Sequence, residues 1–528
     1  MKKRNLLITG RKRKKHSSQV PVDNSKQVRN VFYIINGLLA VAGIIIILKA
    51  TALYGLGITP DSIHYLGCAE NLRAGKGYLD YDGTPYTHWP PLFPSLMALL
   101  SLTGIGPYVS GRIINALSFG GIIFLSGILI HQRIKSFLLA IAGTLTVFLS
   151  STLLKDCTCL WSESVFIVLI IAFIYYITLY LEKERLRLLI LAAVFAAISC
   201  LQRYAGLTAI IAGGILILFF NRKITLWKRF KHSFLFGFIA VAPLCLWIIR
   251  NRLVSKTNIG YEFGLHPDLL SWIVTSPLED VTAWLVTQEL WLPVRLIIIG
   301  FFLSVLIVAK ILRRHKSSDT KIAQVSGIFS LAYAVFVISS AIVVAEANER
   351  LWSVLFVFLV LLMLTAIEAI AELLDRFIKK PPVSNFLVSG IISLWLLFYC
   401  LPIVQQTVSD DCEHGVSGVS SSFWRNAPLA GWLKNHKLDG VFFSDDPEAL
   451  YFLHRIVAEP SLIKTDEITK YREKLSSVKN NYLIWYSMDY YCFSGFRRSY
   501  ICDLSEIAAK FQLKPVIVLP DGGVFIIQ

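Results

Sequence analysis

The sequence VFYIINGLLAVAGIIIILKATAL, residues 31–53, contains a single charged side chain, Lys49. A helix that crosses the hydrocarbon core of a bilayer needs about 20 mainly apolar residues, and this stretch supplies them. The apolar core of a cleaved signal peptide is shorter, at roughly 7–15 residues. Residues 31–53 therefore predict a first membrane span that is retained and not cleaved.

The composition of the whole chain points the same way. Of its 528 residues, 55% are hydrophobic and 16% are charged, whereas soluble domains carry about 25% charged residues. A Lys, Arg or Asp in the middle of a spanning helix costs about 2.5–3.5 kcal/mol, so a surface that faces lipid has to exclude charge. The composition argues against a soluble protein and for one that crosses the membrane many times.

The same length criterion predicts an α-helical polytopic membrane protein with about eleven transmembrane helices. They are expected near residues 31–53, 110–130, 137–154, 164–181, 187–201, 206–220, 233–249, 290–310, 323–345, 351–373 and 385–404. A shorter apolar stretch at residues 91–102 predicts an interfacial helix, because the prolines around its start suit a helix beginning better than a span interior.

The basic residues predict how the spans are oriented. The net charge is +17, and with the N-terminus inside, the inner segments hold 28 Lys and Arg residues against 8 in the outer loops before residue 405. Cytoplasmic loops of membrane proteins carry such an excess. The basic tract in residues 1–30 then anchors the topology, and we expect no nucleic-acid partner. We expect a multi-pass protein of the cell inner (plasma) membrane with a cytoplasmic N-terminus.

This topology divides the chain into three parts. Residues 1–30 form the cytoplasmic N-terminus. Residues 31–404 form the transmembrane domain, with residues 54–109 as its long first extracytoplasmic loop. An odd number of spans places residues 405–528 outside, as a small extracytoplasmic α/β domain.

Within residues 405–528, alternating hydrophobicity predicts strands at residues 440–444, 481–486 and 515–519 and a helix at residues 503–511. Asp521-Gly522-Gly523 predicts a hairpin turn before a last strand. Cys412, Cys492 and Cys502 lie in this part, where an oxidising compartment would allow one disulfide. The nine cysteines of the chain show no metal-binding spacing.

The distribution of polar residues indicates where chemistry occurs. Transporters and proton pumps keep ionisable residues near the middle of the membrane. Here the predicted spans hold few of them, and the polar residues gather at outer span ends and in outer loops. This pattern favours work at the outer surface over transport through the bundle.

Asp61 follows closely after the first predicted span and is expected at the membrane surface. If residues 62–74 are helical, then Asp61, His64 and Tyr65 share one helix face by their spacing. A carboxylate at this place can accept a proton from a hydroxyl or amine as a general base. It can equally be no more than the N-cap of the helix, and the residues alone leave both interpretations open.

Residues 54–103 resemble the first extracytoplasmic loop of the GT-C superfamily of membrane glycosyltransferases. The likeness rests on Asp61, the turn Gly75–Tyr78 and the run Trp89–Pro94. They are similar to bacterial protein O-mannosyltransferase-like enzymes and to the aminoarabinose transferases of lipid A. In those families an acidic residue just after the first span is the catalytic base, often beside a second acid, whereas this chain has Ser62 there.

Three later motifs extend the resemblance to roughly residues 30–375. Trp161–Phe166 resembles the motif that opens the fourth span, and Gln202–Gly206 resembles the element between the fifth and sixth spans. Glu349–Leu351 resembles the arginine that opens a late span, although the prolines that usually follow it are missing. All three motifs fall in predicted outer loops.

The resemblance implies an enzyme that transfers a hexosyl or pentosyl group from a polyprenyl-phosphate donor to a lipid, glycan or protein acceptor outside the membrane. It implies inversion, with Asp61 as base. Glu163 would orient the acceptor or help to bind a divalent metal. Arg203 and Arg350 would hold the phosphate, which an arginine grips through paired hydrogen bonds.

Other interpretations of these residues stay open. An arginine can simply extend its charge to the interface, and Glu163 can simply favour a helix N-terminus. Four further residues are candidates for binding substrate, namely His64, Tyr65, His88 and Tyr204. The rival functions are a transporter or flippase of lipid-linked substrates and a non-catalytic scaffold that presents residues 405–528. An enzyme requires Asp61, Glu163, Arg203 and Arg350 to converge on one site.

Overall fold

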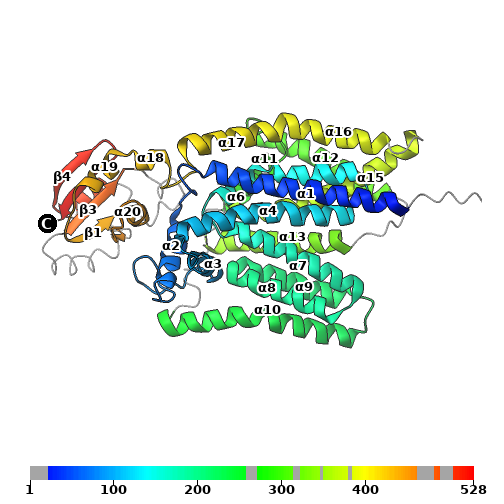
Figure 1. The fold of residues 1–528 in the computed structure, drawn as a ribbon, viewed down its shortest axis with the longest axis horizontal. Coiled ribbons are helices and arrows are strands. Elements are labelled where there is room, and N and C mark those ends of the chain that lie inside the picture. The colour runs from blue at the N-terminus through cyan, green and yellow to red at the C-terminus, as the bar shows by residue number, and fades with distance from the viewer. Residues whose placement is uncertain are drawn as a thin grey trace, which may run out of the picture.

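The computed structural model describes residues 22–256, 270–312, 321–344, 349–378, 383–460, 481–487, 504–509 and 511–527. Long helices run side by side along the longest axis of the molecule (Figure 1). Helix α1 (Val22–Ala50) packs on α4 (Pro107–Arg133), α4 packs on α7 (Glu163–Lys183), and α7 packs on α8 (Leu186–Gln202). A small mixed sheet lies at one end of this bundle, which we call the sheet end.

The other helices complete the bundle and its surroundings. They are α5 (Phe137–Phe148), α6 (Ser151–Thr158), α9 (Leu207–Ile215), α10 (Leu226–Ser255), α11 (Leu270–Ala283), α12 (Leu292–Leu312), α13 (Lys321–Val344), α14 (Glu349–Ser353), α15 (Phe356–Ile378), α16 (Val383–Trp395) and α17 (Leu401–His414).

Seven of the described helices are long and apolar enough to cross a membrane. They are Lys26–Ala50, Pro107–Arg133, Glu163–Lys183, Leu226–Ser255, Lys321–Val343, Phe356–Asp375 and Val383–His414. Helices α5 and α6 form a pair bent by 42°, which makes an eighth if the pair crosses as one. The remaining predicted spans coincide with the shorter apolar helices Leu186–Gln202, Tyr204–Phe220 and Leu292–Val305. The polytopic helical fold is confirmed, and the number eleven stays a prediction.

Small residues let the first two long helices approach closely. A side chain at Gly120 of α4 would come within 2.6 Å of Ile44 and 3.0 Å of the carbonyl oxygen of Ala40, both on α1. Helices in a membrane associate largely through close packing of this kind, because lipid offers no hydrophobic force between them. The packing fixes the end of α1, from which the chain leads directly to Asp61.

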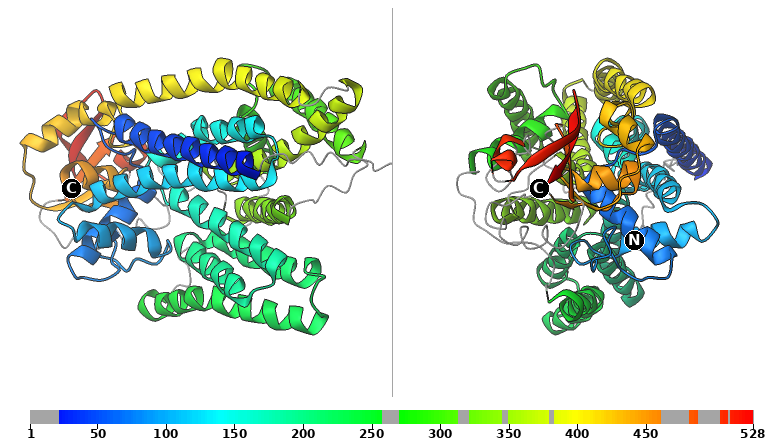
Figure 2. Two further views of the ribbon diagram at one scale, coloured as in Figure 1. Left: turned by 45° about the vertical axis from the view of Figure 1, so that its right-hand side comes forward. Right: turned by 90° about the vertical axis from the view of Figure 1, so that its left-hand side faces the viewer.

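Helices α2 (Pro60–Arg73) and α3 (Leu92–Ser101) lie at the sheet end, away from the end at which α1 begins (Figures 1 and 2). The helix predicted at residues 91–102 is present as α3, and its interfacial position stays a prediction. The interpretation of Asp61 as the N-cap of the loop helix is wrong. Thr59 is the N-cap residue, and Pro60 and Asp61 belong to the first turn. Proline suits this first position, because it has no N–H that could go unpaired there.

The chain leaves the bundle later than the sequence suggests. The last span continues through a short π-helix, η4 (Leu396–Cys400), into α17, so the helix ends at His414 and not near residue 404. Two short helices follow, α18 (Ser422–Arg425) and α19 (Pro428–Asn435). Cys492 and Cys502 lie outside the described residues, and Cys412 is a free thiol.

The sheet contains five strands in the order β2-β1-β3-β5-β4. Strand β1 (Val441–Ser444) pairs in parallel with β2 (Glu459–Pro460) and with β3 (Asn481–Tyr486), while β5 (Gly522–Ile527) pairs antiparallel with β3 and with β4 (Leu513–Leu519). Helix α20 (Pro447–His454) connects β1 to β2, as a parallel pair requires a crossover. The three predicted strands, the turn at Asp521 and a helix in the predicted place, α23 (Leu504–Ala508), are all present.

Candidate active site

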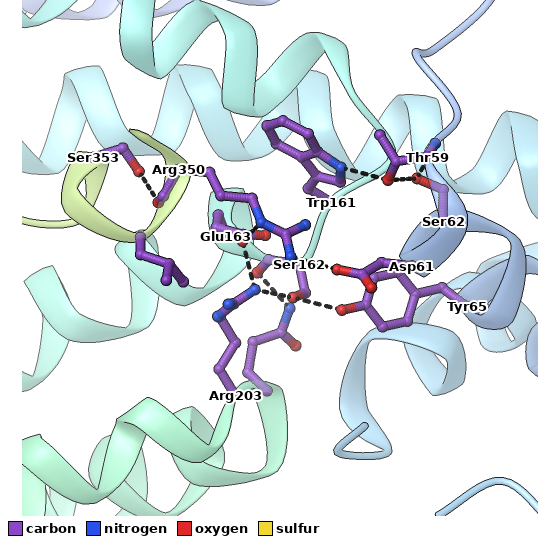
Figure 3. A network of polar contacts seen from close by, with 12 residues as sticks. Thr59, Asp61, Ser62, Tyr65, Trp161, Ser162, Glu163, Arg203, Arg350 and Ser353 are labelled. Carbon is purple, nitrogen blue, oxygen red and sulfur yellow. Dashed lines mark hydrogen bonds and ion pairs between the residues drawn. The ribbon is translucent and has the colours of Figure 1, made fainter. Parts of the chain in front are cut away.

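Four charged residues from four separate parts of the chain lie close together at the sheet end of the bundle (Figure 3). Asp61 lies in the first turn of α2, and Glu163 is the first residue of α7. Arg203 directly follows the last residue of α8, and Arg350 lies on the short helix α14. The sequence predicted one spanning helix at residues 351–373, but α14 is separate from α15, which begins at Phe356.

The four side chains form one continuous ionic network. Arg350 Nη2 is 2.6 Å from Asp61 Oδ2, and Arg350 Nε is 3.5 Å from Glu163 Oε1. Arg203 Nη1 is 2.6 Å from the same oxygen of Glu163. Two carboxylates and two guanidinium groups give the network no net charge. Charged groups can be held away from bulk water only when they are paired in this way.

The members of the network differ in their exposure. The side chain of Glu163 is 1% exposed, whereas those of Arg350, Arg203 and Asp61 are 13%, 16% and 23% exposed. Glu163 is therefore the buried anion that holds both arginines, and Asp61, Arg203 and Arg350 form the part of the network that a substrate can reach.

Burial and charge act on the protonation of Asp61 in opposite directions. Burial alone would raise the pKa of this carboxyl group, but the charge and hydrogen bond of Arg350, with the charges of Arg203 and His64, outweigh burial and hold the pKa below its ordinary value. The pKa of Arg203 is raised, because the nearby Glu163 carboxylate outweighs the effect of burial. Asp61 is thus an ionised carboxylate at neutral pH.

Ser162 joins the network to its neighbours. Its hydroxyl oxygen accepts a hydrogen bond from Arg203 Nη1 at 2.9 Å and lies 3.3 Å from the hydroxyl of Tyr65. Its carbonyl oxygen accepts one from Gln202 Nε2 at 2.9 Å. Burial and the charge of Asp61 raise the pKa of Tyr65 well above its ordinary value. Tyr65 therefore positions groups in this network and does not exchange protons near neutral pH.

Trp161 has two contacts that the sequence did not predict. Its indole Nε1 donates to the hydroxyl of Thr59 at 2.9 Å, which ties the start of α7 to the start of α2. Its ring lies under the guanidinium of Arg350, 5.2 Å from the ring centre. A cation over an aromatic face is stabilised, so Trp161 helps to hold Arg350 in place.

His64 does not hydrogen-bond to Asp61, although both lie on α2. Its Nδ1 is 2.6 Å from Asp80 Oδ2, and its Nε2 is 3.8 Å from Glu448 Oε1 on α20. Burial would lower the pKa of His64, but the hydrogen bond and charge of Asp80, with the charges of Glu448 and Asp61, raise it. His64 therefore links α2 to the sheet-end segment that contains α20.

The other two proposed binding residues lie beside the loop that precedes α3. The ring of His88 is 4.3 Å from that of Trp89, which in turn lies 4.2 Å from the ring of His64. The hydroxyl of Tyr204 donates to the carbonyl oxygen of Thr87 at 3.5 Å. The structure thus brings Tyr65 into the ionic network and places His64, His88 and Tyr204 around residues 86–89.

No family model matches this sequence, and no curated protein matches it. Solved structures match over most of its length. ArnT from Cupriavidus metallidurans in the apo state has a TM-score of 0.61 at 12% identity, over 93% of this chain and 97% of that chain. The same protein bound to undecaprenyl phosphate gives 0.58 at 13%, with the same coverage. The archaeal oligosaccharyltransferase AglB from Archaeoglobus fulgidus, in complex with an inhibitory peptide and a dolichol-phosphate, gives 0.54 at 11%, over 86% of this chain and 69% of that chain.

The chain has the GT-C fold. The resemblance noted in the sequence is therefore confirmed at the level of the fold. In this GT-C bundle the four separate motifs that carried the resemblance all contribute to the network, because Asp61, Glu163, Arg203 and Arg350 each belong to one of them.

One acidic residue beside the GT-C network was missed by the sequence analysis. Asp156 on α6 is 1% exposed and lies close enough to Glu163 and Arg350 to interact with their charges. Its Oδ2 is buried with no hydrogen-bond partner. In the sequence, Asp156 lies between Lys155 and Cys157 in a short predicted outer loop. Nothing in that stretch shows that its side chain is buried.

The network does not fit a divalent metal. Among the described residues, no group of three or more His, Cys, Asp and Glu side chains could hold one. The two carboxylates of the network, Asp61 and Glu163, already face the guanidinium of Arg350. A positive charge so close opposes binding of a second cation. We therefore derive no step through a metal.

Proposed function

We propose that this GT-C chain is a membrane glycosyltransferase that moves a sugar from a polyprenyl-phosphate donor to an acceptor hydroxyl or amine, with inversion. The observation that carries the proposal is the pair of Asp61 and Arg350 at the sheet end of the bundle, 2.6 Å apart and partly exposed. A general base and a phosphate-binding cation within reach of each other are the two groups that this reaction requires.

The ligands bound in two structural neighbours support this class of donor. ArnT was solved with undecaprenyl phosphate, and AglB with a dolichol-phosphate. Both ligands are long isoprenoid chains that end in a phosphate. We expect the same chemistry here, with the tail of the donor in the bilayer and its phosphate beside Arg350. This agrees with the proposed topology, in which the N-terminus is cytoplasmic and the sheet end lies outside.

In the proposed reaction the acceptor oxygen or nitrogen attacks the anomeric carbon of the sugar. The bond between that carbon and the phosphate oxygen breaks, and polyprenyl phosphate leaves with the bonding electrons. The Asp61 carboxylate accepts the proton of the acceptor. Arg350 and Arg203 stabilise the charge that develops on the phosphate, and Glu163 holds both guanidinium groups in place for this purpose.

The ion pair of Asp61 and Arg350 also suggests an order of events. Without a donor, Arg350 is neutralised by Asp61. A donor phosphate offers Arg350 a second anionic partner, and Trp161 keeps the guanidinium close to its present place. As Arg350 turns toward the phosphate, the Asp61 carboxylate loses its partner and becomes a stronger base.

The test is transfer by purified protein in proteoliposomes, from a panel of polyprenyl-phosphate hexoses, pentoses and aminopentoses to lipid, glycan and peptide acceptors. We expect at least one donor to yield released polyprenyl phosphate and a glycosylated acceptor, whose anomeric configuration is opposite to that of the donor. Retained configuration would contradict inversion. Absence of transfer from every donor, by protein that is folded and inserted, would contradict the enzyme itself.

A further inference from the structure

Three stretches of the chain that are far apart in sequence form a small three-stranded strap beside the site. Its central stretch is residues 57–58, just before α2, and its outer stretches are residues 158–160 and 418–419. Parallel bridges join Gly57 to Cys159 and Ile58 to Gly418. The last of these stretches belongs to the C-terminal part of the chain, beyond the membrane helices.

Backbone hydrogen bonds hold the strap on both sides. The N–H of Gly57 donates to the carbonyl oxygen of Thr158, and the N–H of Leu160 donates to that of Gly57, each at 2.9 Å. On the other side, the N–H of Val419 donates to the carbonyl oxygen of Ile58 at 2.9 Å. The three stretches are therefore fixed in register with one another.

The strap leads directly into the ionic network at two points. Its central stretch continues through Thr59 to Asp61, and its 158–160 stretch continues through Trp161 to Glu163. The hydrogen bond from Trp161 to Thr59 joins the two continuations. The strap and this bond thus connect the backbone segments that carry the two carboxylates.

Glycine is required where the C-terminal stretch meets the central one. Gly418 has a φ of +90°, a backbone angle that residues with a side chain rarely adopt. A β-carbon there would lie 1.9 Å from the carbonyl oxygen of Ile58, which leaves no room for any side chain. A side chain at Gly57 would likewise meet Val416 at 2.7 Å and Cys159 at 2.9 Å. The backbone pairing of the strap therefore requires glycine at both positions.

We infer that residues 416–419 are a positioning element of the active site, and that the C-terminal part of this chain sets the place of Asp61 relative to Glu163 and Arg350. Gly418 is then a positioning residue and not a catalytic one, since it touches Ile58 and no reacting atom. The inference rests on the proposed function, because its effect is measured on transfer. A shift of about 1 Å in a reacting group can lower a rate by about 100-fold.

The test compares Gly418→Ala with Gly431→Ala in the full chain. Gly431 lies on α19 in the same C-terminal part, and an added β-carbon there would meet nothing within 4 Å. We expect Gly418→Ala to lower kcat by about 10-fold or more while the KM for the donor changes less than about 3-fold. Gly431→Ala should keep the kcat and KM of the wild type.

A second readout separates positioning from a general loss of structure. If Gly418→Ala moves Asp61 away from Arg350, the pKa of Asp61 in the free enzyme rises, and the acidic limb of the kcat/KM profile moves to higher pH. A merely smaller fraction of folded protein would lower kcat/KM at every pH without moving this limb. Trp161→Phe, which removes only the bond to Thr59 and keeps a ring under Arg350, should move it the same way.

Val416→Ala carries the test if Gly418→Ala fails to insert or fold, because Val416 belongs to residues 416–419 and packs in one buried cluster with Cys159 and Trp161. Unchanged kcat and an unchanged acidic limb in whichever of these two variants folds would overturn the inference. That result differs from failure of the proposed function, in which the wild type itself transfers no sugar.

Discussion

Asp61 and Arg350 are 289 positions apart in the chain, and their side chains meet at 2.6 Å. One lies in the first turn of a loop helix, and the other lies on a helix of five residues between two long ones. Such a contact forms only when the first and the tenth predicted spans end at the same surface. The ion pair is therefore both a consequence of the topology and the centre of the proposed chemistry.

Asp61→Asn should remove most transfer without disturbing the fold. Asn has the shape of Asp but cannot accept the acceptor's proton, and general bases contribute roughly 10²- to 10⁴-fold to rates. We expect kcat to fall by about that factor. Binding of polyprenyl phosphate should stay the same or become tighter, because one of the two anionic groups that face Arg350 is then neutral. Transfer assays and binding titrations in proteoliposomes measure the two effects.

The matched control is Asp82→Asn. Asp82 is an exposed carboxylate of the same first loop, and it accepts hydrogen bonds from the N–H and the hydroxyl of Thr84. This variant should transfer at the wild-type rate. Equal rates for Asp61→Asn and the wild type would exclude Asp61 as the base.

Removing Arg350 should change the pH dependence of transfer in a predictable direction. The pKa of Asp61 lies below its ordinary value of 3.8. Protonation of Asp61 should therefore not lower the kcat/KM of the wild type at pH 5 and above. In Arg350→Gln the effect of burial is no longer outweighed, and the acidic limb should move to higher pH. The KM for the donor should rise as well, since a phosphate ligand is lost. An unmoved limb would show that Arg350 does not act on the base.

The same ion pair contributes to the stability of the fold. A carboxylate with a depressed pKa stabilises the folded state above its unfolded pKa, and this contribution is lost as the pH falls through the folded value. For Asp61 that loss lies below about pH 4. Arg350→Gln should therefore flatten the acid-induced loss of stability that the wild type shows in this range.

Much of the bundle could be predicted from the sequence because a lipid environment leaves few choices. Apolar stretches of span length must be helices, and the order of the charged motifs along the chain showed that they meet at one surface. The four network residues could be named because the resemblance to the GT-C superfamily singled out the motifs that contain them. Their pairing could not, because nothing in the sequence states that Arg350 faces Asp61 and Glu163 at once.

What the sequence missed is set by contacts between distant segments. Asp156 looked like an ordinary loop residue, since its burial depends on α14 and α7 packing over it. Gly418 looked like one of many glycines until Ile58 was found against it. Asp61 was open to interpretation as a helix cap because only the backbone angles show that the helix begins after Thr59.

A buried ion pair at the other end of the bundle should be needed for stability and not for chemistry. Arg133 Nη1 is 3.3 Å from Glu368 Oε2, and both side chains are at most 4% exposed. Glu368 Oε1 also accepts from the N–H of Lys135. Glu368→Gln keeps this last bond but removes the negative charge that faces Arg133, which should cost about 3–5 kcal/mol. Thermal unfolding in detergent measures the loss.

The double variant Arg133→Gln with Glu368→Gln provides the control. It removes both charges and retains groups that can hydrogen-bond, so most of the lost stability should return. Transfer per folded molecule should stay at the wild-type level in all of these variants. A double variant as unstable as Glu368→Gln would show that packing, and not the unpaired charge, is responsible.

The contact between α2 and α20 should weaken as the pH rises. His64 is held between Asp80 and Glu448, and its pKa is raised above the ordinary 6.5. A histidine with a raised folded pKa stabilises the folded state fully below its unfolded pKa and loses this contribution as the pH rises through the folded value. Amide hydrogen exchange in α20, corrected for its intrinsic dependence on pH, should therefore become faster above pH 6.5.

Two variants separate this effect from general loosening. His64→Gln removes the titrating group, so exchange in α20 should lose its dependence on pH in this range. Tyr451→Phe removes the hydrogen bond of 2.8 Å from Tyr451 to Glu70, a second polar link between α20 and α2. It should make exchange faster at every pH while keeping the dependence, because His64 still titrates. If His64→Gln kept the full dependence on pH, the titrating group would have to lie elsewhere in the interface.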